Sequence, residues 1–346
     1  MSCHHYEIMH SRREFLQKTG LGLGAGALAH LLGGCASTST AGDPHINGLP
    51  GIPHFAPKAK RVICLFQSGG PSHLDLLDHK PELERQFDKD LPDSIRRGQR
   101  ITGMVASQAR LACQPSRFKF TRYGQAGTEI SELLPHIGGI ADEICVVRSM
   151  HTEAINHDPA ITFFQTGNQQ PGRPSFGSWT LYGLGSEGAE LPGYVVLTSA
   201  KGTSGGASNY GCGFLPTVHG GIPFRGTGDP VLYLSNPKGI DAPAQRASLD
   251  TLHRLNDLAL AEAGDPEIAA RIASYEMAYQ LQTSAPELMD LSSEPPHILE
   301  LYGIKDVKES NYARNCLLAR RLIERGVRFV QIWSGNDNGF PRRNWD

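Results

Sequence analysis

The sequence lacks three features that would narrow its function at once: a surplus of charge, a long apolar run and a paired-cysteine motif. Its 33 Lys and Arg residues nearly balance 35 Asp and Glu residues, which gives a net charge of −2. Nucleic-acid-binding domains usually carry a basic surplus, so this balance argues against a nucleic-acid partner. No apolar stretch reaches about 18 residues without a glycine, which argues against a multi-span membrane protein.

The seven cysteines are scattered and show neither a Cys-x-x-Cys metal spacing nor a disulfide framework. Glycine and proline are abundant instead, with 39 and 23 residues and no collagen-like period. A chain of 346 residues with 39% hydrophobic residues has enough apolar material for a core. These features predict one large domain with many loops.

The N-terminus is interpreted as an export signal. Arg12 and Arg13 precede Phe15-Leu16 and a weakly apolar run that ends near Gly34. This order is typical of a twin-arginine leader over residues 1–34, which predicts the twin-arginine translocase as a partner. The protein is then expected to be exported to the periplasm or cell envelope. A chance basic start to a helix is the weaker alternative.

Cys35 follows a small residue at the end of this apolar run and resembles the lipidated cysteine of a lipobox. A lipidated Cys35 would anchor the mature chain in a membrane through several acyl chains. Ordinary cleavage further along the chain is the equally weighted alternative. Residues 35–57 are rich in Ser, Thr, Ala and Gly and predict a flexible tether.

The rest of the chain, residues 58–346, predicts a single α/β domain. Four short apolar runs have strand character, and they cover residues 61–67, 143–147, 194–198 and 327–333. The first three are almost continuously apolar, as expected of strands buried on both faces of a parallel sheet. Helical patterns follow at residues 250–263, 265–282 and 311–325, the last stopped by Gly326 just before a strand. The prediction is a doubly wound, mostly parallel sheet with long Gly-rich insertions, chiefly at 167–224.

The first cluster of candidate functional residues follows the first predicted strand. Ser68, Gly69 and Gly70 could let backbone N–H groups approach an anion closely. His73 and Asp75 are ligand types suited to Zn or Mn. The alternative is a tight turn with a serine N-cap and solvated charges, at about even weight.

The second cluster follows the predicted strand at 143–147. It places Ser149, His151, Thr152 and His157 within nine residues, together with further carboxylate and amide side chains. Metal-ligand and nucleophile types gathered at a strand exit favour a functional site over chance clustering.

Weaker candidates lie in the loops. Arg173 and Arg225 could clamp an oxyanion or form surface ion pairs, and the Gly-rich segment 205–211 is interpreted as a plain loop rather than an anion nest. Asp337 and Asp346 follow the last predicted strand. A sheet of this kind rarely ends on such a loop, so we expect the C-terminal part of the domain to be missing.

These motifs resemble family 1501 among the domains of unknown function, a family of exported bacterial proteins labelled sulfatase-like and assigned by fold to the alkaline-phosphatase superfamily. The resemblance covers essentially the whole chain. It rests on the leader and on residues 65–75, 148–157, 172–179, 205–209, 271–277 and 313–331.

The resemblance implies a metal-dependent hydrolase of sulfate or phosphate esters. It implies Thr152 as the nucleophile, with Ser149 as second choice, and a divalent metal, Zn or Ca. His73, Asp75, His151, His157 and Asp346 would be the metal ligands. The usual acidic ligand of the superfamily is not at Gln67 or Ser68, so His73 and Asp75 would have to serve.

Family members continue beyond the position of Asp346 with a segment rich in His, Asp and Glu. The resemblance therefore implies a truncated chain, inactive in this form. The expected substrate is a small ester or a sulfated glycan. The rival hypothesis is a non-catalytic, lipid-anchored envelope protein that reuses the fold for binding. A weaker third is a carbohydrate-processing accessory protein.

Overall fold

The computed structural model describes residues 47–96, 98, 103–188, 190–199, 204–225, 230–231, 234, 236, 238–307 and 311–335. Four strands form its central sheet in the order β1-β6-β4-β5, and all neighbours are parallel. They are β1 (Val62–Phe66), β6 (Phe329–Trp333), β4 (Tyr194–Thr198) and β5 (Ile222–Phe224). The chain is therefore an α/β protein with a parallel sheet, as predicted.

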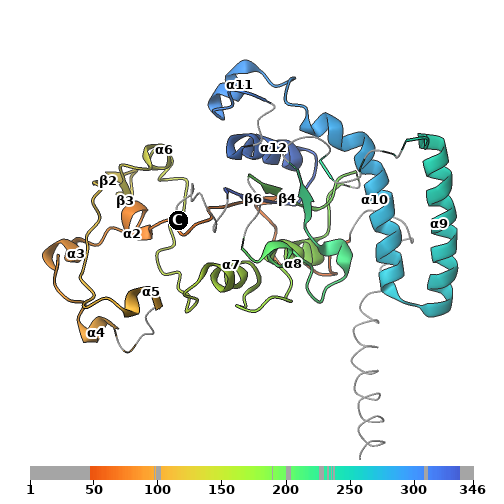
Figure 1. Ribbon diagram of the computed structural model, residues 1–346. Helices are drawn as coiled ribbons and strands as arrows, with labels where there is room; N and C mark the ends of the chain where they lie inside the picture. Colours follow the sequence, from red (N-terminus) through yellow and green to blue (C-terminus); the bar gives the residue numbers. More distant parts are fainter. Residues whose placement is uncertain are drawn as a thin grey trace, which may run out of the picture.

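Helices cover both faces of this sheet because side chains alternate along its strands. Val195, Leu197, Val330 and Ile332 belong to one apolar core, together with residues of α10 (Pro266–Met289) and α12 (Tyr312–Glu324). On the opposite face, Tyr194, Val196, Phe329 and Trp333 form a second core. The helices on that face are α7 (His157–Thr166) and α8 (Phe176–Leu184), below the sheet in Figure 1.

A smaller lobe extends from β1 and lies at the left of Figure 1. It consists of short helices around the antiparallel hairpin of β2 (Phe120–Tyr123) and β3 (Thr128–Ser131). The helices are α2 (His73–Leu76), α3 (Pro81–Arg85), α4 (Asp93–Arg96), α5 (Gly103–Ala106) and α6 (Pro135–Gly138). The remaining short elements are η1 (Gly206–Asn209), η2 (Thr217–His219) and α11 (Pro296–Leu301).

The prediction of a strand at residues 143–147 is wrong. These residues run as an irregular connection, with Cys145 and Val147 exposed. The sheet instead gains β5, which the sequence did not signal because Pro223 interrupts it. An edge strand tolerates this proline because one of its sides needs no N–H donor. A second correction concerns β1, which is an edge strand with Ile63 and Leu65 partly exposed rather than buried on both faces.

A long helical hairpin forms the right side of Figure 1 and consists of α9 (Ala242–Ala263) and α10. Asp241 and Asp265 cap the two helices through their side chains. Helix α9 begins eight residues before its predicted start and buries none of its side chains. Its Leu252, Leu255 and Leu258 are 43%, 57% and 69% exposed.

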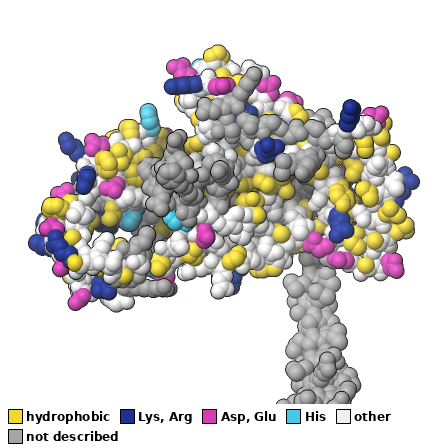
Figure 2. All heavy atoms as spheres, viewed as in Figure 1, with side chains coloured by type: hydrophobic (Ala, Val, Ile, Leu, Met, Phe, Trp, Pro, Cys, Tyr) yellow, Lys and Arg dark blue, Asp and Glu magenta, His cyan; other side chains and the backbone are white. Residues whose placement is uncertain are grey.

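The two helices of the hairpin meet through polar side chains. Arg246 of α9 donates two hydrogen bonds to Glu276 of α10, at 2.9 and 2.7 Å, and its guanidinium lies 4.9 Å from the centre of the Tyr279 ring. None of the helices in the described ranges combines the length and hydropathy that a bilayer crossing requires. Acidic and basic side chains are mixed over the visible face in Figure 2.

Gly177 sets the distance between α8 and the sheet. A methyl group at Gly177 would lie 2.5 Å from ring atoms of Tyr194, which is buried in β4. The loop before the helix is fixed by Ser175, whose Oγ accepts from the Ser178 N–H. The motif at residues 172–179 therefore has a clear packing role.

We predict that Gly177→Ala lowers the free energy of unfolding by about 1–3 kcal/mol, because the added methyl forces α8 away from Tyr194. Gly183→Ala in the same helix is the matched control, since nothing lies within 4 Å of its added methyl. Chemical denaturation should show Gly183→Ala unchanged or stabilised. Equal losses from both substitutions would contradict the packing role.

His219 is buried, and burial lowers its pKa to about 4. In the unfolded chain, His219 becomes protonated near pH 6.5. In the folded chain, it stays neutral until about pH 4. The free energy of unfolding should therefore fall by roughly 3 kcal/mol as the pH drops from 7 to 4. Chemical denaturation at each pH should show that His219→Phe reduces this fall in the free energy of unfolding. The substitution His136→Gln, at an exposed histidine, should leave the fall unchanged. An equal fall in His219→Phe and the wild type would refute the assignment.

Candidate functional site

The carboxyl ends of three parallel strands meet at one edge of the sheet, where ligand sites of such sheets usually lie. Ser68, Ser334 and Ser199 follow β1, β6 and β4 respectively. The Ser68 N–H donates to Ser334 Oγ at 3.0 Å, and the Ser334 N–H donates to the Phe66 carbonyl at 3.1 Å. The Ser199 N–H donates to the Trp333 carbonyl at 3.2 Å. Hydrogen bonds thus hold the three strand ends together beyond the sheet itself.

The first turns of α12 cover this edge with polar side chains. Asn315 is fully buried, and its Nδ2 donates to Ser199 Oγ at 3.0 Å. The Asn315 Oδ1 has no hydrogen-bond partner. Gln67 Nε2 donates to the Tyr312 hydroxyl at 2.8 Å, and burial raises the Tyr312 pKa to about 12. A neutral phenol and amide therefore face the strand ends at ordinary pH.

The glycine turn after β1 has the backbone freedom that the sequence suggested. Gly69 and Gly70 have φ angles of +91° and +69°, a region that favours glycine. The turn leads into α2, whose N-cap Ser72 makes no side-chain capping bond. His73 is exposed at the start of α2, and Asp75 accepts a hydrogen bond from Ser116 Oγ at 2.7 Å.

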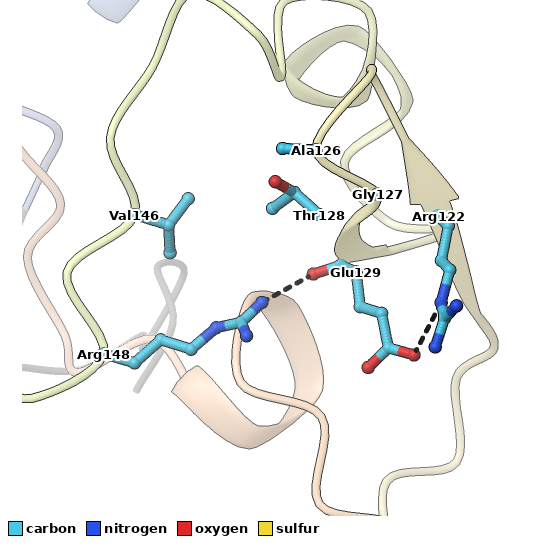
Figure 3. A pocket seen from close by; sticks show the side chains of 7 residues that line it. All are labelled: Arg122, Ala126, Gly127, Thr128, Glu129, Val146 and Arg148. Atoms are coloured by element: carbon cyan, nitrogen blue, oxygen red, sulfur yellow. Dashed lines mark hydrogen bonds and ion pairs between the residues drawn. The ribbon is translucent and has the colours of Figure 1, made fainter.

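Arg148 joins the second predicted cluster to the first. Its Nε donates to the Leu77 carbonyl at 2.8 Å, at the end of α2, and its Nη2 donates to the Glu129 carbonyl of β3 at 3.2 Å. Figure 3 shows this guanidinium reaching the hairpin beside a pocket of about 420 Å³. On the far side of the pocket, Arg122 pairs with the Glu129 carboxylate at 3.6 Å. Arg148 therefore links the connection before α7 to α2 and to the β2–β3 hairpin.

The predicted nucleophile and histidines follow Arg148. Ser149, His151 and Thr152 are exposed in the connection to α7, and the Thr152 hydroxyl accepts from the Ala154 N–H at 3.1 Å. His157 opens α7, and its N–H donates to Asn156 Oδ1 at 2.8 Å. The Thr152 hydroxyl is accessible to a substrate in this arrangement.

The predicted metal ligands do not form a closed site. Within the described ranges, no three His, Cys, Asp or Glu side chains are grouped so that they could hold a metal ion. Asp346 lies outside those ranges, as do Asp337, Arg12, Arg13 and Cys35. Within the described ranges, His73, Asp75, His151 and His157 are therefore not grouped as a metal site on their own.

The weaker loop candidates make no printed hydrogen bond to Ser68, Ser199 or Ser334, although Arg225 directly follows the carboxyl end of β5. Arg173 and Arg225 are exposed. The segment at 205–211 contains η1, and buried Asn209 holds it through a bond from its Nδ2 to the Ser204 carbonyl. Sequence reasoning missed Ser199, Asn315 and Ser334. The one available signal was a polar Asn315 within the helical pattern of residues 311–325.

We predict that Arg148→Ala frees the connection at residues 149–156 from α2, because both bonds from its guanidinium are lost. Hydrogen-exchange mass spectrometry should show faster exchange in that connection and at the end of α2, with about 1–2 kcal/mol lost locally. Arg122→Ala is the control, since this side chain is 79% exposed and its ion pair with Glu129 is long, at 3.6 Å. Equal exchange in Arg148→Ala and the wild type would disprove the bridging role.

Comparison with known protein families gives a match over most of the chain. The DUF1501 family, described as proteins of unknown function, matches residues 59–346. No curated protein matches the chain significantly, and no solved structure does.

Proposed function

The chain belongs to the DUF1501 family of proteins of unknown function, and we propose that it is an exported hydrolase of sulfate or phosphate esters. The proposal includes a doubly wound fold of the alkaline-phosphatase and sulfatase type. It also includes a divalent metal, Zn or Ca, which enters through the resemblance of the motifs. The expected substrate is a small ester or a sulfated glycan.

The observation that supports this proposal most is the bridge made by Arg148. It ties the connection that carries Ser149, His151 and Thr152 to the end of α2, the helix that carries His73 and Asp75. The start of the second candidate cluster is thus linked to α2, which follows the carboxyl end of β1. Enzymes with parallel sheets usually bind their substrates at the carboxyl edge of the sheet.

In the proposed reaction, the Thr152 hydroxyl oxygen attacks the sulfur or phosphorus of the ester. The bond to the alcohol oxygen breaks, and the alcohol leaves with a proton. Water then hydrolyses the sulfo- or phospho-threonine, releasing the inorganic anion and regenerating the hydroxyl. Backbone N–H groups of the Ser68–Gly70 turn, with Arg173 as a further candidate, would bind the anionic oxygens.

Location is a separate part of the proposal. Arg12 and Arg13 would direct the chain to the twin-arginine translocase, and a lipidated Cys35 would hold it in the cell envelope. The near-neutral net charge of −2 supports the expectation of no nucleic-acid partner.

A second candidate function is a non-catalytic, lipid-anchored binding protein. The observation that favours it is the lack of a grouped set of three ligand side chains within the described ranges. A binding protein could hold its ligand at the hydrogen-bonded strand ends and the glycine turn, and it needs no nucleophile.

The two functions are separated by Thr152→Ala and His157→Ala in protein purified from its native envelope. For a hydrolase, turnover of an aryl sulfate or aryl phosphate ester should fall by about 10³-fold in Thr152→Ala, because the nucleophile is lost. Metal content by mass spectrometry should fall in His157→Ala. Thr121→Ala, at an exposed position of β2, should change neither.

Ester turnover and metal content that stay unchanged in both variants would reject the hydrolase and favour the binding protein. If Thr152→Ala loses turnover but the wild type contains no bound metal, Thr152 is supported as the nucleophile and the metal is rejected.

A further inference from the structure

A cavity of about 170 Å³ lies where the helical hairpin meets the sheet. It is lined by one side of α10, the starts of β4 and β5, η2 and Leu181 of α8, and it opens to solvent beside Ser274 and Ala278, which are exposed. Its apolar lining includes Leu181, Ile222, Val231, Met277 and Leu281. Small residues on α10, chiefly Ala273 and Ala278, leave the space open.

The polar side chains around this cavity already have partners. Thr217 Oγ1 donates to Glu267 at 3.2 Å, and Ser274 Oγ donates to the Ala270 carbonyl at 2.8 Å within α10. The Tyr194 hydroxyl donates to Gln331 inside the sheet. The hydroxyl protons of these three side chains are thus already used in hydrogen bonds, and most of the lining is apolar. The space is therefore suited to an apolar occupant.

This cavity is remote from the candidate site. It touches Gly193 and Tyr194 at the amino end of β4, whereas Ser199 follows the carboxyl end of that strand. Five residues of extended chain separate the two ends by about 16 Å. An occupant of the cavity would not contact the strand ends or the connection that carries Thr152.

We propose that this cavity binds a small apolar molecule, of the size of one aromatic ring with a short alkyl substituent. An apolar cavity of about 150 Å³ is large enough for a benzene ring. The flexible, polarisable side chain of Met277 can adjust to such a ring. The bound ring would fill the seam between α10 and the sheet and stabilise the hairpin against it.

The test uses toluene as the probe and the full chain with its methionine methyl groups labelled for NMR. Toluene at saturation should shift the Met277 methyl signal, assigned with Met277→Leu, and raise the melting temperature by about 3 °C. Phenol, which has a similar shape but carries a hydroxyl, should bind more weakly, because moving its hydroxyl from water into a mainly apolar lining costs free energy.

Two variants fill the cavity, Ala273→Leu within it and Ala278→Leu at its rim. Both should abolish the toluene shift, while Ala259→Leu on the exposed side of α9 should keep it. Undisturbed methyl signals in the wild-type chain would refute the proposal even if a filled variant failed to fold. Equal binding of phenol, or toluene binding retained in both filled variants, would refute it as well. Ester turnover reports on Thr152 and should not respond to these substitutions.

Discussion

Parallel pairing on both sides of β6 is the constraint on which the rest of the structure depends. This strand bonds to β1 on one side and β4 on the other, and all five of its residues are buried. A strand without solvent on either face needs a layer of helices over each, which α10 and α12 supply on one side and α7 and α8 on the other. Because every pairing is parallel, all four carboxyl ends lie at one edge, where hydrogen bonds at Ser68, Ser199 and Ser334 join three of them.

The sequence predicted the interior of the fold well and its borders poorly. Residues 194–198 match β4 in full, because a continuous apolar run marks a doubly buried strand, and the largely apolar run at 327–333 contains β6. The same signal misled at 143–147, where an apolar run follows the protein surface. Apolar content alone does not tell whether a neighbouring strand is available for pairing. The short strand β5 was not predicted, because Pro223 in its middle is typical of a loop.

The candidate site divides in a similar way. Local signals identified the glycine turn at Gly69 and Gly70, whose positive φ angles follow from residue type and position. Asn315 and Ser199 were missed because their proximity depends on how α12 docks across the sheet, which no short motif encodes. Arg148 stood inside a quoted motif, yet its bonds to Leu77 and Glu129 depend on tertiary contacts. A sequence shows which residue types could bind or react, but it does not show which distant segments come into contact.

The contact between α9 and α10 bears on which part of the molecule unfolds first. Helix α9 buries no side chain, and Arg246 joins it to Glu276 and the Tyr279 ring of α10. A helix attached this way loses little apolar burial on detaching, so it is the natural first unit of sub-global unfolding, while α10 stays in the core. Partly exposed ion pairs are screened by salt, so ionic strength would set how often α9 detaches.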